Sequence, residues 1–183
     1  ADRNRDWTID GLDPLVGYDV AGGEERAAGS SYRNPTEAEI VADEVERLRE
    51  HGVAQSDIGV ITPYSGQIGC IENALAGRDV RTRGVEVDTV DSFQGSEREA
   101  VVLSLVRSND RGSAGFLTFG DEGERRLNVS LTRAKRRLVV VGDFDTLGTV
   151  ADHRDPGTSC ADVYADLRAR LPIRPDPPTA DGR

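Results

Sequence analysis

Short, continuous apolar runs alternate with segments of helical spacing along this chain, and this alternation constrains the fold more than any other feature. The runs Ile58–Thr62 (IGVIT), 100–106 (AVVLSLV) and 138–142 (LVVVG) lack polar alternation, which is typical of strands buried on both faces of a parallel sheet. Further strands are predicted over 15–20 and 85–90, and helices over 36–51, 64–76, 124–135 and 160–171.

Strands that alternate with helices are joined by right-handed crossovers, which make the strands parallel and cover both faces of the sheet. The predicted fold class is therefore α/β, with three layers: one parallel sheet between two layers of helices. The 183 residues fit one domain, which we expect over 14–171. A flexible segment is expected over 1–13, and a disordered, proline-rich tail over 172–183.

The formal net charge of -10 argues against a protein that coats nucleic acid with a general basic surface. The basic residues are almost all arginine, which suits bidentate phosphate contacts better than lysine does. The cysteines and histidines lie far apart without metal-ligand spacing, so neither a metal site nor a disulfide framework is expected. This cysteine usage favours the reducing cytoplasm as the location. No apolar run approaches the roughly 18 residues of a membrane span, so we expect no membrane partner.

Polar clusters next to the apolar strands are the candidates for function, because ligands of parallel sheets bind beyond the carboxyl ends of the strands. The loops ranked first on this basis follow Thr62, Val90, Val106 and Gly142. The clusters themselves are Thr62-Pro63-Tyr64 with Gln67, the stretch 88–97 (DTVDSFQGSE) and the stretch 125–135 (RRLNVSLTRAK). Taken singly, each cluster has an ordinary alternative: a strand end, a polar turn or a solvated helix surface.

The third cluster combines apolar anchors with arginines on one predicted helix. Arg126 and Arg133 lie seven residues apart, so both are expected on the same face, while Leu127 and Leu131 can face the core. Such a helix suits recognition of an anion. The stretch 119–124 (FGDEGE) just before it is acidic and is expected to form a surface loop.

The second cluster carries groups that suit a nucleotide or a sugar-phosphate chain. Thr89 and Ser92 supply hydroxyls, Gly95 lets the backbone approach a ligand closely, and Glu97 can accept hydrogen bonds from a ribose. The chain contains no glycine-rich loop ending in Gly-Lys-Ser/Thr, the usual phosphate loop of nucleotide-binding domains.

Together, in this order, the clusters resemble the C-terminal motifs of superfamily 1B helicases. ITPYSGQ resembles motif IV, VDTVDSFQGSEREAVVLSLVRSN resembles motif V with the strand after it, and GFLTFGDEGERRLNVSLTRAKRRLVVVGD resembles motif VI with its strand. SYRNPTEAE resembles the short motif that opens this domain. The resemblance runs from about residue 15 to residue 143 and implies a RecA-like domain, the second of two in the motor.

In that family ATP and Mg²⁺ lie in the cleft between the two RecA-like domains, held mainly by the first one, which is thus the implied partner. Arg133 matches the arginine finger, which offsets charge on the γ-phosphate. Glu97, Gly95 and Gln94 match the part of motif V that binds ATP, and Arg126 is implied to support the same site. The isolated chain is expected to hydrolyse little ATP, because it lacks the phosphate loop.

The resemblance also places single-stranded DNA or RNA across the top of both domains. Thr62, Tyr64, Thr89 and Ser92 are the implied contacts to its sugar-phosphate backbone. The whole assignment would fail if Arg133 lay away from the sheet edge where the functional loops gather and its side chain pointed into bulk solvent on the opposite side. Two alternatives remain open: a degenerate RecA-like module that binds nucleic acid or protein without ATPase activity, and an unrelated doubly wound small-molecule binder.

Overall fold

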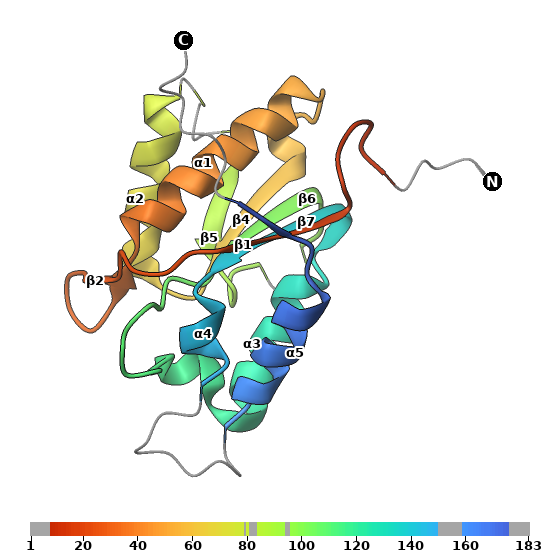
Figure 1. Ribbon diagram of the computed structural model, residues 1–183. Helices are drawn as coiled ribbons and strands as arrows, with labels where there is room; N and C mark the ends of the chain where they lie inside the picture. Colours follow the sequence, from red (N-terminus) through yellow and green to blue (C-terminus); the bar gives the residue numbers. More distant parts are fainter. Residues whose placement is uncertain (1–7, 79, 81–83, 94–95, 150–158, 176–183) are drawn as a thin grey trace.

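The computed structural model describes residues 8–78, 80, 84–93, 96–149 and 159–175 (Figure 1). A single parallel sheet has the strand order β5-β4-β6-β7-β1-β8. Its strands are β1 (Leu15–Asp19), β4 (Ile58–Thr62), β5 (Glu86–Thr89), β6 (Arg98–Ser104), β7 (Ala134–Gly142) and β8 (Ile173–Arg174). A separate two-stranded antiparallel hairpin comprises β2 (Glu25–Arg26) and β3 (Tyr32–Arg33).

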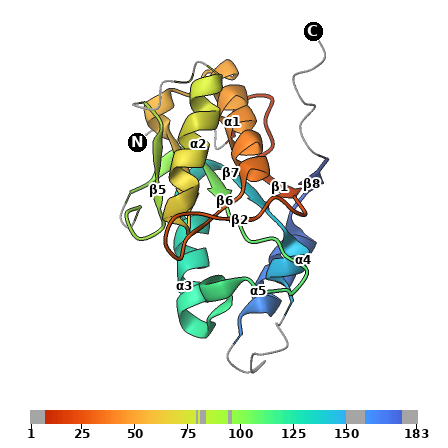
Figure 2. The ribbon, with the colours of Figure 1, turned by 90° about the vertical axis from the view of Figure 1, so that its left-hand side faces the viewer.

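Helices cover both faces of the sheet, as Figures 1 and 2 show. One face carries α1 (Pro35–Glu50) and α2 (Ser65–Gly77). The opposite face carries α3 (Gly120–Leu131), α4 (Phe144–Leu147) and α5 (Ala161–Arg170), with short 3-10 turns η1 (Gln55–Asp57) and η2 (Gly115–Thr118) in the connections. The predicted three-layer α/β fold is confirmed, and its arrangement is that of a RecA-like domain.

Alternate residues of each central strand point to opposite faces of the sheet, and this produces two separate apolar cores. Val60, Val102 and Val139 pack beneath α1 and α2. Ile61 and Leu103 point the other way, into the core beneath α3 and α5. Since both faces are buried, the strands read as unbroken apolar runs, as the sequence indicated.

A buried ion pair ties α1 to the sheet. The side chains of Glu44 on α1 and Arg137 on β7 are both fully buried, with Nη2 of Arg137 2.7 Å from Oε2 of Glu44. The other carboxylate oxygen accepts a hydrogen bond of 2.6 Å from the hydroxyl of Tyr18 on β1. Burial, together with this bond to Glu44, raises the pKa of Tyr18 to about 12.

The folded part of the chain extends beyond the expected boundaries at both ends. Ile9 and Leu12 are buried, although both lie in the segment predicted to be flexible. The expected disordered tail is wrong for its first residues, because Ile173–Arg174 forms β8 and pairs with Gly17 and Tyr18 of β1. No helix in these described ranges is both long and apolar enough to cross a membrane.

The predicted helix over 124–135 is wrong at both ends. α3 begins at Gly120, so the stretch expected to be a surface loop supplies its first turns. It ends at Leu131, because Thr132 and Arg133 form a turn and Ala134 already pairs with Arg98 in the sheet. Pairing with β6 thus overrides the helical spacing of the sequence at residues 132–135.

Candidate functional site

The candidate residues divide between opposite edges of the sheet. Thr62 and Thr89 end β4 and β5, and lie at the carboxyl edge. Glu97 and Arg133, in contrast, directly precede β6 and β7, and so lie at the amino edge. The expectation that Arg133 lies with the carboxyl-edge loops is therefore wrong, because α3 carries the chain back across the sheet before β7 begins. It does not point into bulk solvent, since it is half-buried against its neighbours.

Motifs V and VI nevertheless meet along the loop that follows β5 (the loop 90–97). Its described residues 90–93 lie beside α3, and residues 96 and 97 lie beside the turn that ends this helix. At the amino edge the backbone carbonyl of Arg133 accepts a hydrogen bond of 3.0 Å from the amide of Arg98. The Arg133 guanidinium reaches the carbonyl of Ser96 at 3.5 Å, so it lies next to the exposed Glu97.

The Arg133 side chain is folded back on the end of α3. Its Nε donates to the carbonyl of Val129 at 3.0 Å, and its Nη2 donates to the hydroxyl of Thr132 at 3.0 Å. The last carbonyls of a helix have no partner within it and carry the negative end of the helix dipole, so a guanidinium is favourable there. These are weak, partly exposed contacts that an anion could replace.

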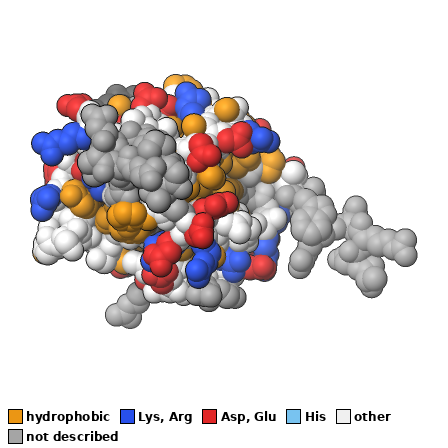
Figure 3. Space-filling model, turned by 90° about the horizontal axis from the view of Figure 1, so that it is seen from below, with side chains coloured by type: hydrophobic (Ala, Val, Ile, Leu, Met, Phe, Trp, Pro, Cys, Tyr) orange, Lys and Arg blue, Asp and Glu red, His pale blue; other side chains and the backbone are white. Residues whose placement is uncertain are grey.

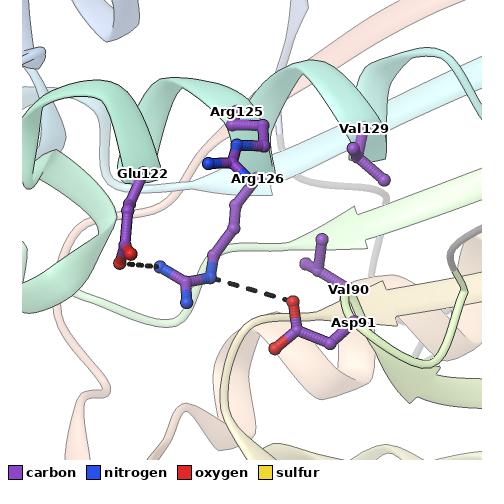
Figure 4. Close-up of a pocket in the computed structure, with 6 residues that line it drawn as sticks. All are labelled: Val90, Asp91, Glu122, Arg125, Arg126 and Val129. Atoms are coloured by element: carbon purple, nitrogen blue, oxygen red, sulfur yellow. Dashed lines mark hydrogen bonds and ion pairs between the residues drawn. The ribbon is translucent and has the colours of Figure 1, made fainter.

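The contacts that α3 and the turn after it make with the described residues of the loop 90–97 form a seam between the two sheet edges. At its carboxyl-edge end, α3 and the loop enclose a small hollow lined by Val90, Asp91, Glu122, Arg125, Arg126 and Val129 (Figure 4). Arg126 lies between two carboxylates, with Glu122 at 3.3 Å and Asp91 at 3.9 Å. Its guanidinium also lies 5.4 Å from the ring centre of Phe116. Arg126 and Arg133 share the side of α3 that faces the loop, but only Arg126 is on the helix itself.

The loop is fastened to the sheet by Phe93, which is fully buried. The ring lies against Gly59 of β4, where an added Cβ atom would come within 2.9 Å of its Cε1 atom. Only a residue without a side chain leaves this space, so Gly59 fixes how closely the loop approaches β4. Gln94 and Gly95, which were predicted to shape the ATP-binding part of the loop, lie outside the described residues.

The four predicted nucleic-acid contacts differ in accessibility. Thr89 and Ser92 are half-buried and exposed, respectively, at the carboxyl edge, and their hydroxyls lie 3.3 Å apart. Thr62 is fully buried and Tyr64 is only 5% exposed. Both were predicted to contact the sugar-phosphate backbone, but neither side chain is accessible here, because each ends or follows a strand that is buried on both faces.

Tyr64 instead belongs to a row of aromatic rings and guanidinium groups beneath the carboxyl edge. Its ring meets Tyr32 edge-on at 5.6 Å and Phe116 at 4.9 Å between ring centres. The guanidinium of Arg107 lies 4.1 Å from the centre of the Tyr32 ring and donates to the Tyr64 hydroxyl at 3.3 Å. Burial raises the pKa of Tyr64, against the opposing influence of Arg107.

Comparison with known proteins decides the family. A family model described as an AAA domain, AAA_12, matches residues 1–145. The chain is 41% identical over 141 residues to "DNA polymerase alpha-associated DNA helicase A" of Saccharomyces cerevisiae, covering 73% of this chain and 20% of that protein. It is 46% identical over 135 residues to "Regulator of nonsense transcripts 1 homolog" of Neurospora crassa, covering 71% of this chain and 12% of that protein.

The chain belongs to the AAA_12 domain family of superfamily 1 helicases. A further relative of this helicase domain is "DNA-binding protein SMUBP-2" of Rattus norvegicus, 37% identical over 142 residues, with 75% of this chain and 14% of that protein covered. The chain thus spans about a fifth or less of the length of these relatives. The predicted resemblance to the C-terminal motor domain of such helicases is confirmed.

Sequence reasoning missed the residues that hold the carboxyl edge of this helicase domain together. Glu37 at the start of α1 is fully buried, and its carboxylate accepts hydrogen bonds from the hydroxyl of Ser104 at 2.7 Å and the amide of Val106 at 2.9 Å. Val106 has a φ of 75°, which a β-branched residue adopts only under strain. Burial raises the pKa of Glu37 to about 8, despite these hydrogen bonds.

The strained turn aims Arg107 at the aromatic row. The sequence gives no local signal for it, since valine is the residue type least expected at a positive φ. Arg107 lies in the run LVRSN, which resembles the end of motif V, and it is not among the predicted site residues. The signal that could have identified Arg107 is its place directly after an apolar strand, because an arginine buried there requires a partner for its charge. Here that partner is Glu24, 2.9 Å away.

Proposed function

We propose that this chain is the second motor domain of an ATP-driven helicase or translocase that acts on single-stranded DNA or RNA. The first RecA-like domain of the same protein holds ATP and Mg²⁺, and this chain presents Arg133 and Glu97 to that nucleotide. The observation that carries the proposal is the meeting of the loop 90–97 with the end of α3, which brings Arg133 beside Ser96.

The position of Arg133 at the amino edge fits an action on a neighbour's nucleotide. The carboxyl-edge rule applies to a ligand bound by the sheet itself, whereas a finger must project toward a ligand held by another domain. Phosphoryl transfer spreads negative charge over the equatorial oxygens, and a positioned guanidinium offsets that charge, with an effect on the order of 10³–10⁵ in rate. Arg133 would exchange the Val129 carbonyl and the Thr132 hydroxyl for phosphate oxygens, which form stronger, charge-assisted bonds.

Arg126 supports the same site from the other end of the seam. Its two carboxylate neighbours leave its charge largely compensated, as expected of a residue that orders the loop 90–97 against α3. This favours a role in positioning Asp91 and the residues that follow it, with Glu97 as the group closer to the nucleotide.

The nucleic acid would cross the carboxyl edge, over the hydroxyls of Thr89 and Ser92. Hydroxyls and backbone amides bind phosphates and sugars without reading the sequence of bases, which suits a motor that steps along any strand. Thr62 and Tyr64 would act from below, by supporting the loop after β4. ATP binding and hydrolysis would close and reopen the cleft between the motor domains and so shift their grip on the strand.

The test compares ATP hydrolysis by the 183-residue chain and by a protein in which the chain follows its first RecA-like domain. We expect almost no hydrolysis by the chain alone, and hydrolysis stimulated by single-stranded nucleic acid when both domains are present. Robust stimulated hydrolysis by the chain alone would contradict the proposal that the first RecA-like domain holds ATP and Mg²⁺. Strand binding without any hydrolysis by the two-domain protein would favour the alternative, a degenerate binding module.

A further inference from the structure

The hairpin β2–β3 is held firmly at the carboxyl edge although its strands are only two residues long. Such a short hairpin has no stability of its own in water. Here Oε2 of Glu24, just before β2, accepts hydrogen bonds from Nε of Arg107 at 2.9 Å, the amide of Ser108 at 2.8 Å and Nδ2 of Asn109 at 3.0 Å. All three donors follow β6, so the hairpin is fastened beside the ends of the central strands.

Contacts on the other arm place the hairpin next to motif IV. The hydroxyl oxygen of Ser31 accepts a hydrogen bond of 2.9 Å from the amide of Gly66, at the start of α2. Tyr32 covers the guanidinium of Arg107 and meets Tyr64, as described above. Figure 2 shows β2 crossing in front of the sheet.

The two arginines of the hairpin point to different sides of it. Arg26 pairs with Tyr32 across the hairpin and Glu25 pairs with Arg33, so the two pairs occupy opposite faces. Arg33 and Glu25 lie on the face opposite to Arg26, and β3 itself packs against α2. Arg33 is already neutralised, because its charge and that of Glu25 lie 2.8 Å apart.

Arg26 lies on the face that belongs to the aromatic row. Its guanidinium is 5.6 Å from the centre of the Tyr32 ring, and the residue is exposed. Within the described residues no carboxylate lies within ion-pair distance of it. Stacking on a ring holds a guanidinium in place while its N–H groups stay free to bind a phosphate in a bidentate manner.

The aromatic row continues from this arginine across the carboxyl edge. Tyr32 contacts Tyr64, Tyr64 contacts Phe116, and the guanidinium of Arg126 covers Phe116. A second hollow above the row has a volume of about 350 Å³. It is lined by Pro63, Thr89, Val90, Asp91, Phe116, Phe119, Glu122 and Arg126. Arg26 therefore lies at the outer end of the surface that carries Thr89.

Acidic side chains limit the path on the other side of the hairpin. A wide hollow beyond the ends of β6 and β7 is lined in part by Asp110, Asp143 and Asp145, which outnumber the one arginine of its lining, Arg111. Phosphates are repelled there, and the net charge of -10 makes the domain as a whole unfavourable to nucleic acid. A strand that leaves Thr89 along this edge is therefore directed over the hairpin.

We propose that Arg26 binds a backbone phosphate of the single strand, and so extends the nucleic-acid track from the loops after β4 and β5 onto the hairpin β2–β3. The inference rests on the proposed function, because it names a further contact for the same strand. Arg26 is a binding residue that touches substrate, whereas Arg107 and Glu24 are positioning residues that hold the hairpin.

The experiment measures binding of fluorescent oligothymidylate and oligouridylate to the 183-residue chain by anisotropy, over a series of salt concentrations. Each phosphate contact to a single strand contributes about -0.7 to the slope of log K against log salt. Arg26→Ala is expected to make the slope less negative by about 0.7, so a tenfold rise in salt costs about fivefold less affinity than in the wild type. Arg26→Lys should retain the wild-type slope, because it retains the charge.

Arg33→Ala is the matched control, since it removes the same charge from the opposite face of the same hairpin. It should change the slope by much less, and both alanine variants should keep the wild-type melting temperature. A wild-type slope for Arg26→Ala, or an equal change for Arg33→Ala, would overturn the inference and leave the proposed function standing. Absence of binding by the wild-type chain even at low salt would remove the proposed track and this contact together.

Discussion

Replacement of Glu44 by alanine should destabilise the fold strongly. The change leaves the guanidinium of Arg137 in the core without a counter-charge, and the hydroxyl of Tyr18 without its acceptor. Arg47, whose Nε lies 3.5 Å from Glu44, remains partly exposed and can turn to water. Arg137 keeps only the carbonyl of Asp13 as a described partner, and its Nε has none among the described residues.

The magnitude follows from these losses. Removing one partner of a buried ion pair costs about 3–5 kcal/mol, and an unsatisfied buried hydroxyl adds about 1 kcal/mol or more. Against a total stability of roughly 5–15 kcal/mol for a domain, Glu44→Ala should leave the chain at the margin of unfolding. Equilibrium urea unfolding at neutral pH, followed by circular dichroism, measures the loss.

Two further variants test whether the loss of stability comes from the unpaired charge of Arg137 and not from mutation of the helix in general. Glu50→Ala, at the exposed end of the same helix, should change the free energy of unfolding by no more than about 0.5 kcal/mol. The double variant Glu44→Leu/Arg137→Met should recover much of the loss, because it leaves no unpaired charge in the core. A loss below about 1 kcal/mol for Glu44→Ala would refute the reasoning.

The buried carboxyl of Glu37 should make the free energy of unfolding depend on pH. Its pKa is raised to about 8 in the folded chain, whereas in the unfolded chain it has the ordinary value of 4.5. Between these two pH values the native state therefore holds a proton that the unfolded state has released. The stability that the Glu37 carboxyl contributes is complete below pH 4.5 and decreases as the pH rises to 8, by no more than about 1.4 kcal/mol per pH unit. Glu37→Gln should remove this pH dependence in urea titrations, and an unchanged profile would contradict the reasoning. Gly59→Ala should cost about 1–3 kcal/mol by displacing Phe93 and with it the loop 90–97. Gly69→Ala, on an open helical surface, is its control and should be neutral or stabilising in thermal melts; equal effects of the two would show that Phe93 does not need the space.

The central strands could be predicted from sequence because each is buried on both faces and so carries a continuous apolar signal. Ile58–Thr62 was predicted with the observed bounds. The turn after α3 could not be predicted, because Leu127, Leu131 and Ala134 keep helical spacing through a stretch where pairing with β6 requires a strand. Boundaries depend on such long-range partners, which a local pattern does not contain.

For the candidate site, the ordered motifs assigned the loop 90–97 and the segment before β7 to one ATP site, and the structure places Ser96 beside Arg133. The expected sheet edge for Arg133 was wrong, since the edge depends on how far α3 runs before the chain turns. Nor did the motifs predict that Thr62 and Tyr64 are buried, because the sequence alone does not distinguish a hydroxyl-bearing residue that faces water from one that faces the core. The strain at Val106 exists only because Glu37, distant in sequence, stabilises that turn.

The most direct test of the account is single-turnover ATP hydrolysis, with ATP binding measured separately, by the two-domain protein carrying Arg133→Ala. Arg125→Ala is the matched control, because this exposed arginine lies on the same helix and has no assigned role in the finger. The account predicts that Arg133→Ala slows hydrolysis by about 10³-fold or more while ATP affinity stays near that of the wild type, and that the control hydrolyses normally. Wild-type hydrolysis by Arg133→Ala would contradict it.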